Sequence, residues 1–170
     1  GSNQIGAIET RDLAAMKTQQ LAVLGSAQLA GLDSGDIIAM SDGQWAAVGS
    51  RQLGLLNQAQ LSAIEVGDFS ALGSGALRGL STTAIGWLST EQIGALGSQQ
   101  VNALLSAQVR ALTPEDMAAL SADALQGLNS AGMLALTSAQ VQALTLGNTY
   151  VNVHSTANPG GEVRGQLTRQ

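Results

Sequence analysis

Apolar side chains recur along this chain in two registers, each with a period of eight residues. All eighteen multiples of eight from Ile8 to Leu144 are apolar, and so are all eighteen positions of the register from Ile5 to Val141. The residue just before each multiple of eight is Ala or Gly in fifteen of eighteen cases. Self-similarity at a fixed period is the signature of a repeat architecture. The pattern therefore predicts one uninterrupted array of eight-residue repeats, or octads, over residues 5–144.

Polar residues follow the same period and describe a helix start in every octad. The residue after each multiple of eight is Ser, Thr, Asn, Asp or Gly in fourteen of eighteen cases, and the position three residues later is Gln or Asp in thirteen of eighteen cases. This is the spacing of a capping box, in which two side chains bind free backbone N–H groups. Around Thr113 the code is complete: Pro114 takes the first helical position and Asp116 the third, while Leu112 and Met117 form a hydrophobic staple.

Three arrangements of such octads can be compared. A single continuous helix turns about 100° per residue, so its apolar stripe would drift around the rod. A β-helix would place the two apolar registers on opposite faces of a strand, and Ala, Leu and Gln are helix formers. Helices of about six residues are unstable alone, but stacking on neighbouring turns can stabilise them. We therefore expect a mostly α fold, namely a solenoid of very short helices.

The spacing of glycines indicates how many helices complete one coil. At the capping positions Gly occurs only at Gly25, Gly49, Gly73 and Gly97, each three octads from the next. If a coil closes after three octads, these glycines line up along one edge of the solenoid. The spacing favours three helices, one from each of three successive octads, per coil.

Both apolar registers are expected to line the interior, with the Ala/Gly position as a third inward position. Trp87 and Leu55 replace the small residue there, while Trp45 and Phe69 are oversized members of an apolar register. For each of these four residues, space filling is weighed against stacking of a ligand. Ser, Ala, Gln, Gly and Asn, with few charges, occupy the positions expected to face outward. Such a weakly charged surface tolerates lateral or end-to-end association.

After Leu144 the octads stop and an alternating, β-branched pattern begins. Residues 149–156 and 162–168 have the pattern of two strands joined by a turn, so a small β-hairpin is predicted in the segment 145–170. A free hairpin is marginally stable. We expect its apolar residues either to form a lid on the last coil or to pair with another chain by strand addition. These candidate assembly or lid residues are Tyr150, Val151, Val153, Val163 and Leu167.

Two resemblances support this division of the chain. Residues 147–167 contain the runs GNTYVNVHS and NPGGEVRGQL, and this segment resembles the closing motif of the CHRD (chordin-type) domain. The rest of the CHRD β-fold has no counterpart in the sequence. Residues 5–144 resemble the Leu-, Ser-, Gln- and Ala-rich short helical repeats of large secreted or surface bacterial proteins. The resemblances imply an extracellular protein of adhesive or matrix type.

Composition restricts the possible partners. The 170 residues carry seven basic and twelve acidic side chains, a net charge of −5, and the basic residues are scattered, which argues against nucleic-acid binding. There is no cysteine, so disulfides and thiolate chemistry are excluded. No sequence segment is apolar over the length that spans a bilayer. Gly1-Ser2 resembles the remnant of an expression tag, so residues 1–4 are expected to be a lead-in, compatible with removal of a native signal peptide.

Residues that could carry chemistry are few. His154 is the single histidine, which excludes multi-His metal sites and His-based catalytic triads. Asp36, Asp68 and Asp116 stand where helix starts favour acids, so capping is weighed against calcium binding, for which a dense Asp ladder is missing. The Gly-Ser-Gly run at residues 73–75 follows no predicted strand, which argues against a nucleotide loop. We expect no catalytic residues, no metal and no cofactor.

These features predict a non-enzymatic structural repeat protein of the cell surface or extracellular matrix. In this interpretation the solenoid serves as a stalk, filament or matrix subunit and associates with further copies of itself. The alternative is an adhesion module that recognises a surface glycan or protein through one face of the solenoid.

Overall fold

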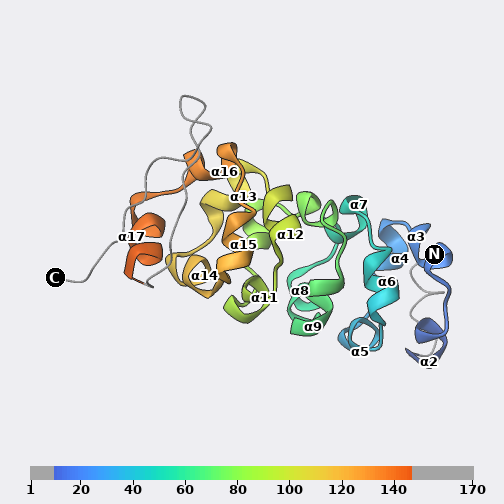
Figure 1. The fold of residues 1–170 in the computed structure, drawn as a ribbon. Helices are drawn as coiled ribbons and strands as arrows, with labels where there is room; N and C mark the ends of the chain where they lie inside the picture. The colour runs from blue at the N-terminus through green and yellow to red at the C-terminus, as the bar shows by residue number, and fades with distance from the viewer. Residues whose placement is uncertain (1–9, 147–170) are drawn as a thin grey trace.

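The part of the chain described by a computed structural model, residues 10–146, is a solenoid of short helices (Figure 1). Its coils follow one another along one axis, from α2 near the N-terminus to α17. This range contains no strand. The predicted mostly α solenoid is therefore confirmed for residues 10–146, whereas the predicted hairpin and its candidate assembly residues lie beyond the described range.

Three octads complete one coil, because helices three octads apart in the sequence contact each other. The first stack of helices consists of α2 (Thr10–Ala14), α5 (Ser34–Ile38), α8 (Gln58–Ala63), α10 (Thr82–Ile85), α13 (Ser106–Ala111) and α16 (Ser130–Ala135). The second consists of α3 (Thr18–Ala22), α6 (Asp42–Ala46), α9 (Val66–Ala71), α11 (Thr90–Gly94), α14 (Pro114–Ala119) and α17 (Ser138–Leu146). The third consists of α4 (Ser26–Leu29), α7 (Ser50–Leu53), the 3-10 helix η1 (Ala76–Gly79), α12 (Ser98–Ala103) and α15 (Ala122–Gln126).

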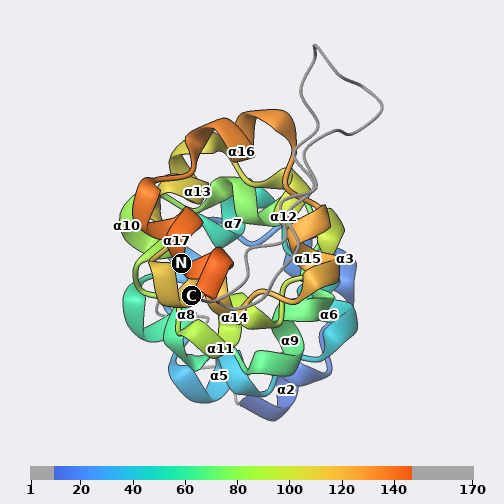
Figure 2. The same cartoon turned by 60° about the vertical axis from the view of Figure 1, so that its left-hand side comes forward.

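The stacks wind gradually around the axis of the solenoid. In Figure 2, α2 and α5 of the first stack lie at the bottom, α10 lies at the left and α16 lies at the top. The capping glycines belong to one stack, as their spacing predicted: Gly25, Gly49 and Gly97 precede α4, α7 and α12, and Gly73 lies just before η1. Their alignment has no steric cause at Gly49, where an added Cβ would meet nothing within 4 Å.

The helix starts follow the predicted capping code. Thr113 has extended backbone angles, its hydroxyl accepts from the backbone N–H of Asp116 at 3.0 Å, and the Asp116 carboxylate accepts from the Thr113 N–H at 2.9 Å. Pro114 is the first residue of α14. Most helices span four to six residues, whereas α17 spans nine and ends at Leu146, two residues beyond the predicted end of the array.

The two apolar registers form one core along the whole solenoid. Leu53, Leu61, Phe69 and Met117 are fully buried, and Trp45 is 1% exposed, so both oversized residues named above fill core space. The Ala/Gly position differs from the prediction, because it is mostly half-buried and lies between coils rather than in the interior.

Candidate functional site

A ladder of buried glutamine side chains joins each coil to the one before it. In Gln60 the amide oxygen accepts from the Asn57 N–H at 3.0 Å, which completes a capping box. The amide nitrogen donates to the carbonyl oxygens of Leu29 and Leu32 at 2.7 and 2.8 Å, which lie 31 and 28 residues earlier. One side chain therefore starts its own helix and binds the backbone of the preceding coil.

The same arrangement recurs along the array. Seven ladder glutamines donate to carbonyls 28 and 31 residues earlier: Gln44, Gln52, Gln60, Gln92, Gln100, Gln108 and Gln140. All seven are at most 8% exposed. The capping code predicted only a local role for these glutamines, and Gln was expected among the outward residues, so their burial is a correction. A buried amide is stabilising when both of its ends have partners.

One feature of the sequence points to the second role of the ladder. A capping box accepts either Glu or Gln at its third helical position. At this position the array contains Gln and Asp but never Glu. Glu would satisfy the local N–H but has no N–H to donate to the preceding coil, so the choice of Gln reflects a contact that is distant in sequence.

Asp36, Asp68 and Asp116, the aspartates at ladder positions for which capping was predicted, fall into two groups. The Asp36 and Asp116 carboxylates accept from the N–H groups of Asp33 and Thr113 at 3.1 and 2.9 Å, which confirms the capping interpretation for both. Asp68 is 8% exposed, but α9 has no capping box. The capping interpretation is therefore wrong for Asp68.

Asp68 instead lies in a small acidic and aromatic cluster. Burial, with a further contribution from the neighbouring Asp42 carboxylate, raises the pKa of the Asp68 carboxyl to about 6. The indole N–H of Trp45 acts in the opposite direction, although its buried Nε1 does not reach hydrogen-bond geometry with any acceptor of residues 10–146. The carboxyl group of Asp68 therefore becomes ionised near pH 6 instead of near pH 4.

This raised pKa predicts a pH-dependent stability. Between about pH 4 and pH 6 the folded chain holds the Asp68 proton and the unfolded chain does not, so stability should fall as pH rises through that window. Asp68→Asn should remove this pH dependence and raise the free energy of unfolding at pH 7 by about 1 kcal/mol, after discounting for solvent screening near the surface. Thermal unfolding followed by circular dichroism at several pH values measures both effects. The control is Asp123→Asn, at an exposed acid of α15, which should unfold with the same pH dependence as the unmodified chain. If Asp123→Asn removed that pH dependence, it could not be assigned to Asp68.

Two positions in each octad form the seam between coils. The forward seam position, two residues before a multiple of eight, faces the following coil: a Cβ added at Gly94 would lie 3.2 Å from the Ala119 carbonyl oxygen. The backward seam position, one residue before a multiple of eight, faces the preceding coil: a Cβ at Gly79 or Gly127 would overlap the carbonyl of Ser50 or Ser98. A forward seam position and its backward partner on the next coil are 25 residues apart, as in the hydrogen bond from Asn102 Nδ2 to the Gly127 oxygen at 3.1 Å, whereas the Ser50 and Ser98 carbonyls lie 29 residues before their glycines.

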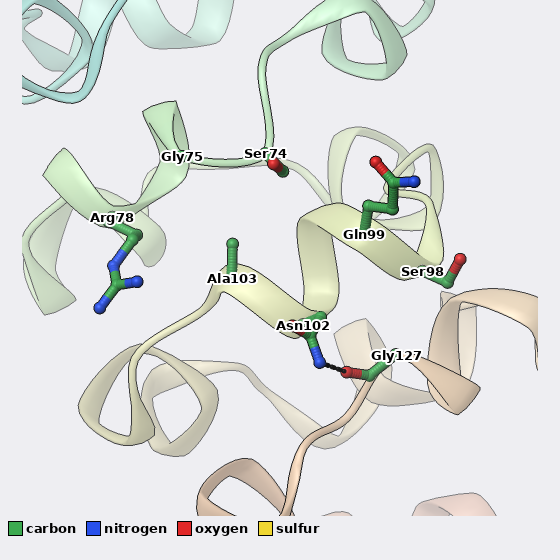
Figure 3. A pocket seen from close by; sticks show the side chains of 8 residues that line it. All are labelled: Ser74, Gly75, Arg78, Ser98, Gln99, Asn102, Ala103 and Gly127. Atoms are coloured by element: carbon green, nitrogen blue, oxygen red, sulfur yellow. Dashed lines mark hydrogen bonds between the residues drawn. The ribbon is translucent and has the colours of Figure 1, made fainter.

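A polar hollow of about 540 Å³ lies over the seam of the third stack (Figure 3). Arg78 of η1 lies on one side of it, and Gln99 and Ser98 of α12 lie on the other, with the Asn102–Gly127 hydrogen bond along its edge. Its polar groups belong to exposed or half-buried side chains. The hollow could contact hydroxyl or carboxylate groups, but it lacks the buried, convergent polar groups of a built ligand site.

A second hollow, of about 370 Å³, contains the half-buried Trp87. Ile38 and Val66, which are 50% and 45% exposed, line the same hollow, as does the carboxylate-bearing Glu65. Three residues break the small-residue rule: Val23, Leu55 and Trp87. Trp87 lines this hollow, and Leu55 is exposed at the surface, 41% of its area being accessible.

The two ends of the described array expose apolar residues at the seam. Val23 occupies the backward seam position of the first coil and is 79% exposed. Leu134 occupies the forward seam position of the last coil and is 87% exposed. Val141, a core-register residue of the last coil, is 45% exposed, whereas its counterpart Leu13 in the first coil is buried. These side chains are placed where an adjoining coil would cover them.

Other candidate chemistry can be located only in part. Within residues 10–146 no group of three or more His, Cys, Asp or Glu side chains could hold a metal ion. None of the helices in that range is long and apolar enough to cross a membrane. His154 and the five candidate assembly or lid residues lie outside the described residues.

Comparison with known proteins identifies the repeat. A family model described as the ALTTAQ repeat matches residues 5–42, 61–98, 88–114 and 114–146, which together exceed half of the chain. The run ALTSAQ at residues 135–140 differs from that description at one letter. The matched segments end at residue 146, so they do not bear on the resemblance of residues 147–167 to the CHRD motif. No curated protein and no solved structure matches the chain.

Proposed function

Because the chain belongs to the ALTTAQ repeat family, we propose that its solenoid is the functional product, a non-enzymatic structural element of the cell surface or extracellular matrix. It would act as a stalk or as a subunit of a filament or matrix. The glutamine ladder carries this proposal. A repeated, buried hydrogen-bonded joint between coils stiffens a rod along its axis. The described residues contain no comparable convergence of polar groups on a ligand site.

The rod predicted by this proposal has a length that can be tested. Stacked helices lie about 8–10 Å apart, so nearly six coils should give a rod on the order of 50–60 Å long. A variant in which residues 82–105 are duplicated should be longer by about 10 Å, because one coil is added. Small-angle scattering measures the maximum dimension of both chains. An unchanged maximum dimension in the longer variant would contradict the rod.

The location of the protein needs a separate test. Antibodies against the purified chain should stain intact, unpermeabilised producer cells or the material between them. Staining that requires permeabilised cells would contradict the surface or matrix assignment, while leaving the rod itself unaffected.

A second candidate function, adhesion, is favoured by the hollow around Trp87. An accessible indole ring beside hydroxyl and carboxylate groups suits a sugar ring, which presents C–H bonds to the aromatic face. The chain has one other tryptophan, Trp45, which is 1% exposed and would add its own emission to that of Trp87. In a Trp45→Phe background, titration with surface glycans should change the Trp87 emission, and Trp87→Ala should remove binding. If Trp87→Ala still binds the glycan, the binding site does not include Trp87.

A further inference from the structure

The two ends of the array carry matching halves of the same joint. At the first coil, the amide oxygens of Gln20 and Gln28 accept from the N–H groups of Lys17 and Gly25 at 2.9 and 3.0 Å, as in the internal ladder. In that ladder geometry, each amide nitrogen faces the place of a preceding coil. Both side chains are accessible, Gln28 being half-buried and Gln20 exposed.

At the other end, the last coil offers the acceptors. The internal rule pairs each ladder amide with carbonyls 31 and 28 residues earlier. For a following coil, this rule leaves three pairs of carbonyls: those of Met117 with Leu120, of Leu125 with Leu128 and of Met133 with Leu136. Within residues 10–146, no ladder glutamine follows to bind them.

We propose that the N-terminal end of one copy stacks on the C-terminal end of a second copy, in register with the octads. One offset of the incoming chain satisfies three contacts together. In this register, Val23 of the incoming copy lies where a residue 25 positions after Leu134 would lie if the first copy continued, which is the place of the seam partner of Leu134. Gln28 of the incoming copy then lies at the place of a ladder glutamine that would bind the carbonyls of Met133 and Leu136, with the same spacings of 31 and 28 residues as inside one chain.

The same offset places Gln20 over the carbonyls of Leu125 and Leu128. The third ladder position of the incoming coil is Asp12, which has no N–H to donate, and the array accepts an aspartate at the equivalent position of α14, where Asp116 only caps its helix. Two glutamine clamps and one apolar seam contact therefore define the joint. Because the contact is head-to-tail, it does not close on itself, and it generates linear chains of copies.

This inference rests on the proposed structural role and names the partner surface for it. The chain lacks cysteine, so a thiol can be placed at each end without side reactions. We expect full-length Val23→Cys and Leu134→Cys chains, mixed under mild oxidation, to form a disulfide-linked heterodimer. Each variant alone should form little homodimer, because the joint pairs an N-terminal end with a C-terminal end and does not bring two identical ends together. A control pair of Val66→Cys, at a 45% exposed residue in mid-array, with Leu134→Cys should give only background crosslinking.

Association without a crosslink provides the second measurement. Sedimentation velocity should show concentration-dependent linear oligomers of the full chain. Leu134→Asp should weaken association by about 100-fold, because it places an unpaired carboxylate in the apolar seam. The control Val66→Asp should associate normally. Unchanged thermal unfolding of Leu134→Asp shows that the effect is on the joint.

Three results would overturn the joint. The first is equal crosslinking of the control pair, and the second is normal association of Leu134→Asp. The third is protection of the Leu134→Cys thiol from a maleimide at concentrations where the chain is monomeric, which would mean that residues of the same chain cover that end. If the chain is monomeric but has the length of a rod, the joint is wrong and the proposed structural role still stands. If the chain does not have that length, the proposed structural role is wrong as well.

Discussion

Gln60→Glu should lower the free energy of unfolding by about 3–5 kcal/mol at pH 7. The new carboxylate can still accept from the Asn57 N–H, so the helix start survives. The amide nitrogen, however, is replaced by a second oxygen that faces the carbonyls of Leu29 and Leu32, where Gln60 now donates at 2.7 and 2.8 Å. The site is only 2% exposed, so neither the charge nor the carbonyls can be hydrated.

A matched control lies two residues away in the same helix. Gln58 is exposed at the start of α8, where a carboxylate interacts favourably with the helix dipole, so Gln58→Glu should be neutral or stabilising by a few tenths of a kcal/mol. Urea unfolding followed by circular dichroism compares the two variants. The deficit of Gln60→Glu should shrink below about pH 5, because a protonated carboxyl regains one O–H donor. Equal losses in the two variants would show that the ladder does not join the coils.

Gly127→Ala should lower the free energy of unfolding by about 3 kcal/mol, at the upper end of the usual cost of overpacking. A Cβ at Gly127 would overlap the Ser98 carbonyl, and a backbone group cannot move aside as the end of a flexible side chain can. The two coils would have to separate, which also strains the hydrogen bond from Asn102 to the Gly127 oxygen.

The matched control for this substitution is Gly67→Ala in α9. A Cβ at Gly67 would meet nothing within 4 Å, so the change should stabilise the chain by about 0.5 kcal/mol through the lower entropy of the unfolded state. Thermal unfolding of both variants gives the comparison. If Gly127→Ala is as well tolerated as Gly67→Ala, the coils do not approach as closely as the structure shows.

Features that depend on local spacing could be predicted from the sequence. The octad period identified both core registers, and Thr113 with Asp116 displayed the capping code within one octad. Gly25, Gly49, Gly73 and Gly97 indicated the three-helix coil, because a spacing of three octads has a direct geometric meaning. These signals consist of residue types repeated at fixed positions, which is why one sequence was sufficient.

The joints between coils were harder to predict. The partners of Gln60 are backbone carbonyls 31 and 28 residues earlier, and a carbonyl has no residue type that marks it. The absence of Glu at the ladder position was the available signal, but it has meaning only once the coil geometry is known. At Asp68 the local rule failed because tertiary structure, through burial and then through the neighbouring Asp42 carboxylate, raises the pKa of the carboxyl group. Gly127 looked like any other small residue of the array, although its contact with Ser98 tolerates no side chain.

The ladder also determines how this solenoid would respond to being pulled. Each joint connects a coil to its immediate predecessor through a few short hydrogen bonds, so tension along the axis would open joints one at a time. A released coil of three octads can extend to about 80 Å, compared with the roughly 10 Å that it contributes when stacked. A tether of this kind would lengthen in discrete steps under load and rewind when the load falls. It would protect whatever it connects from sudden force.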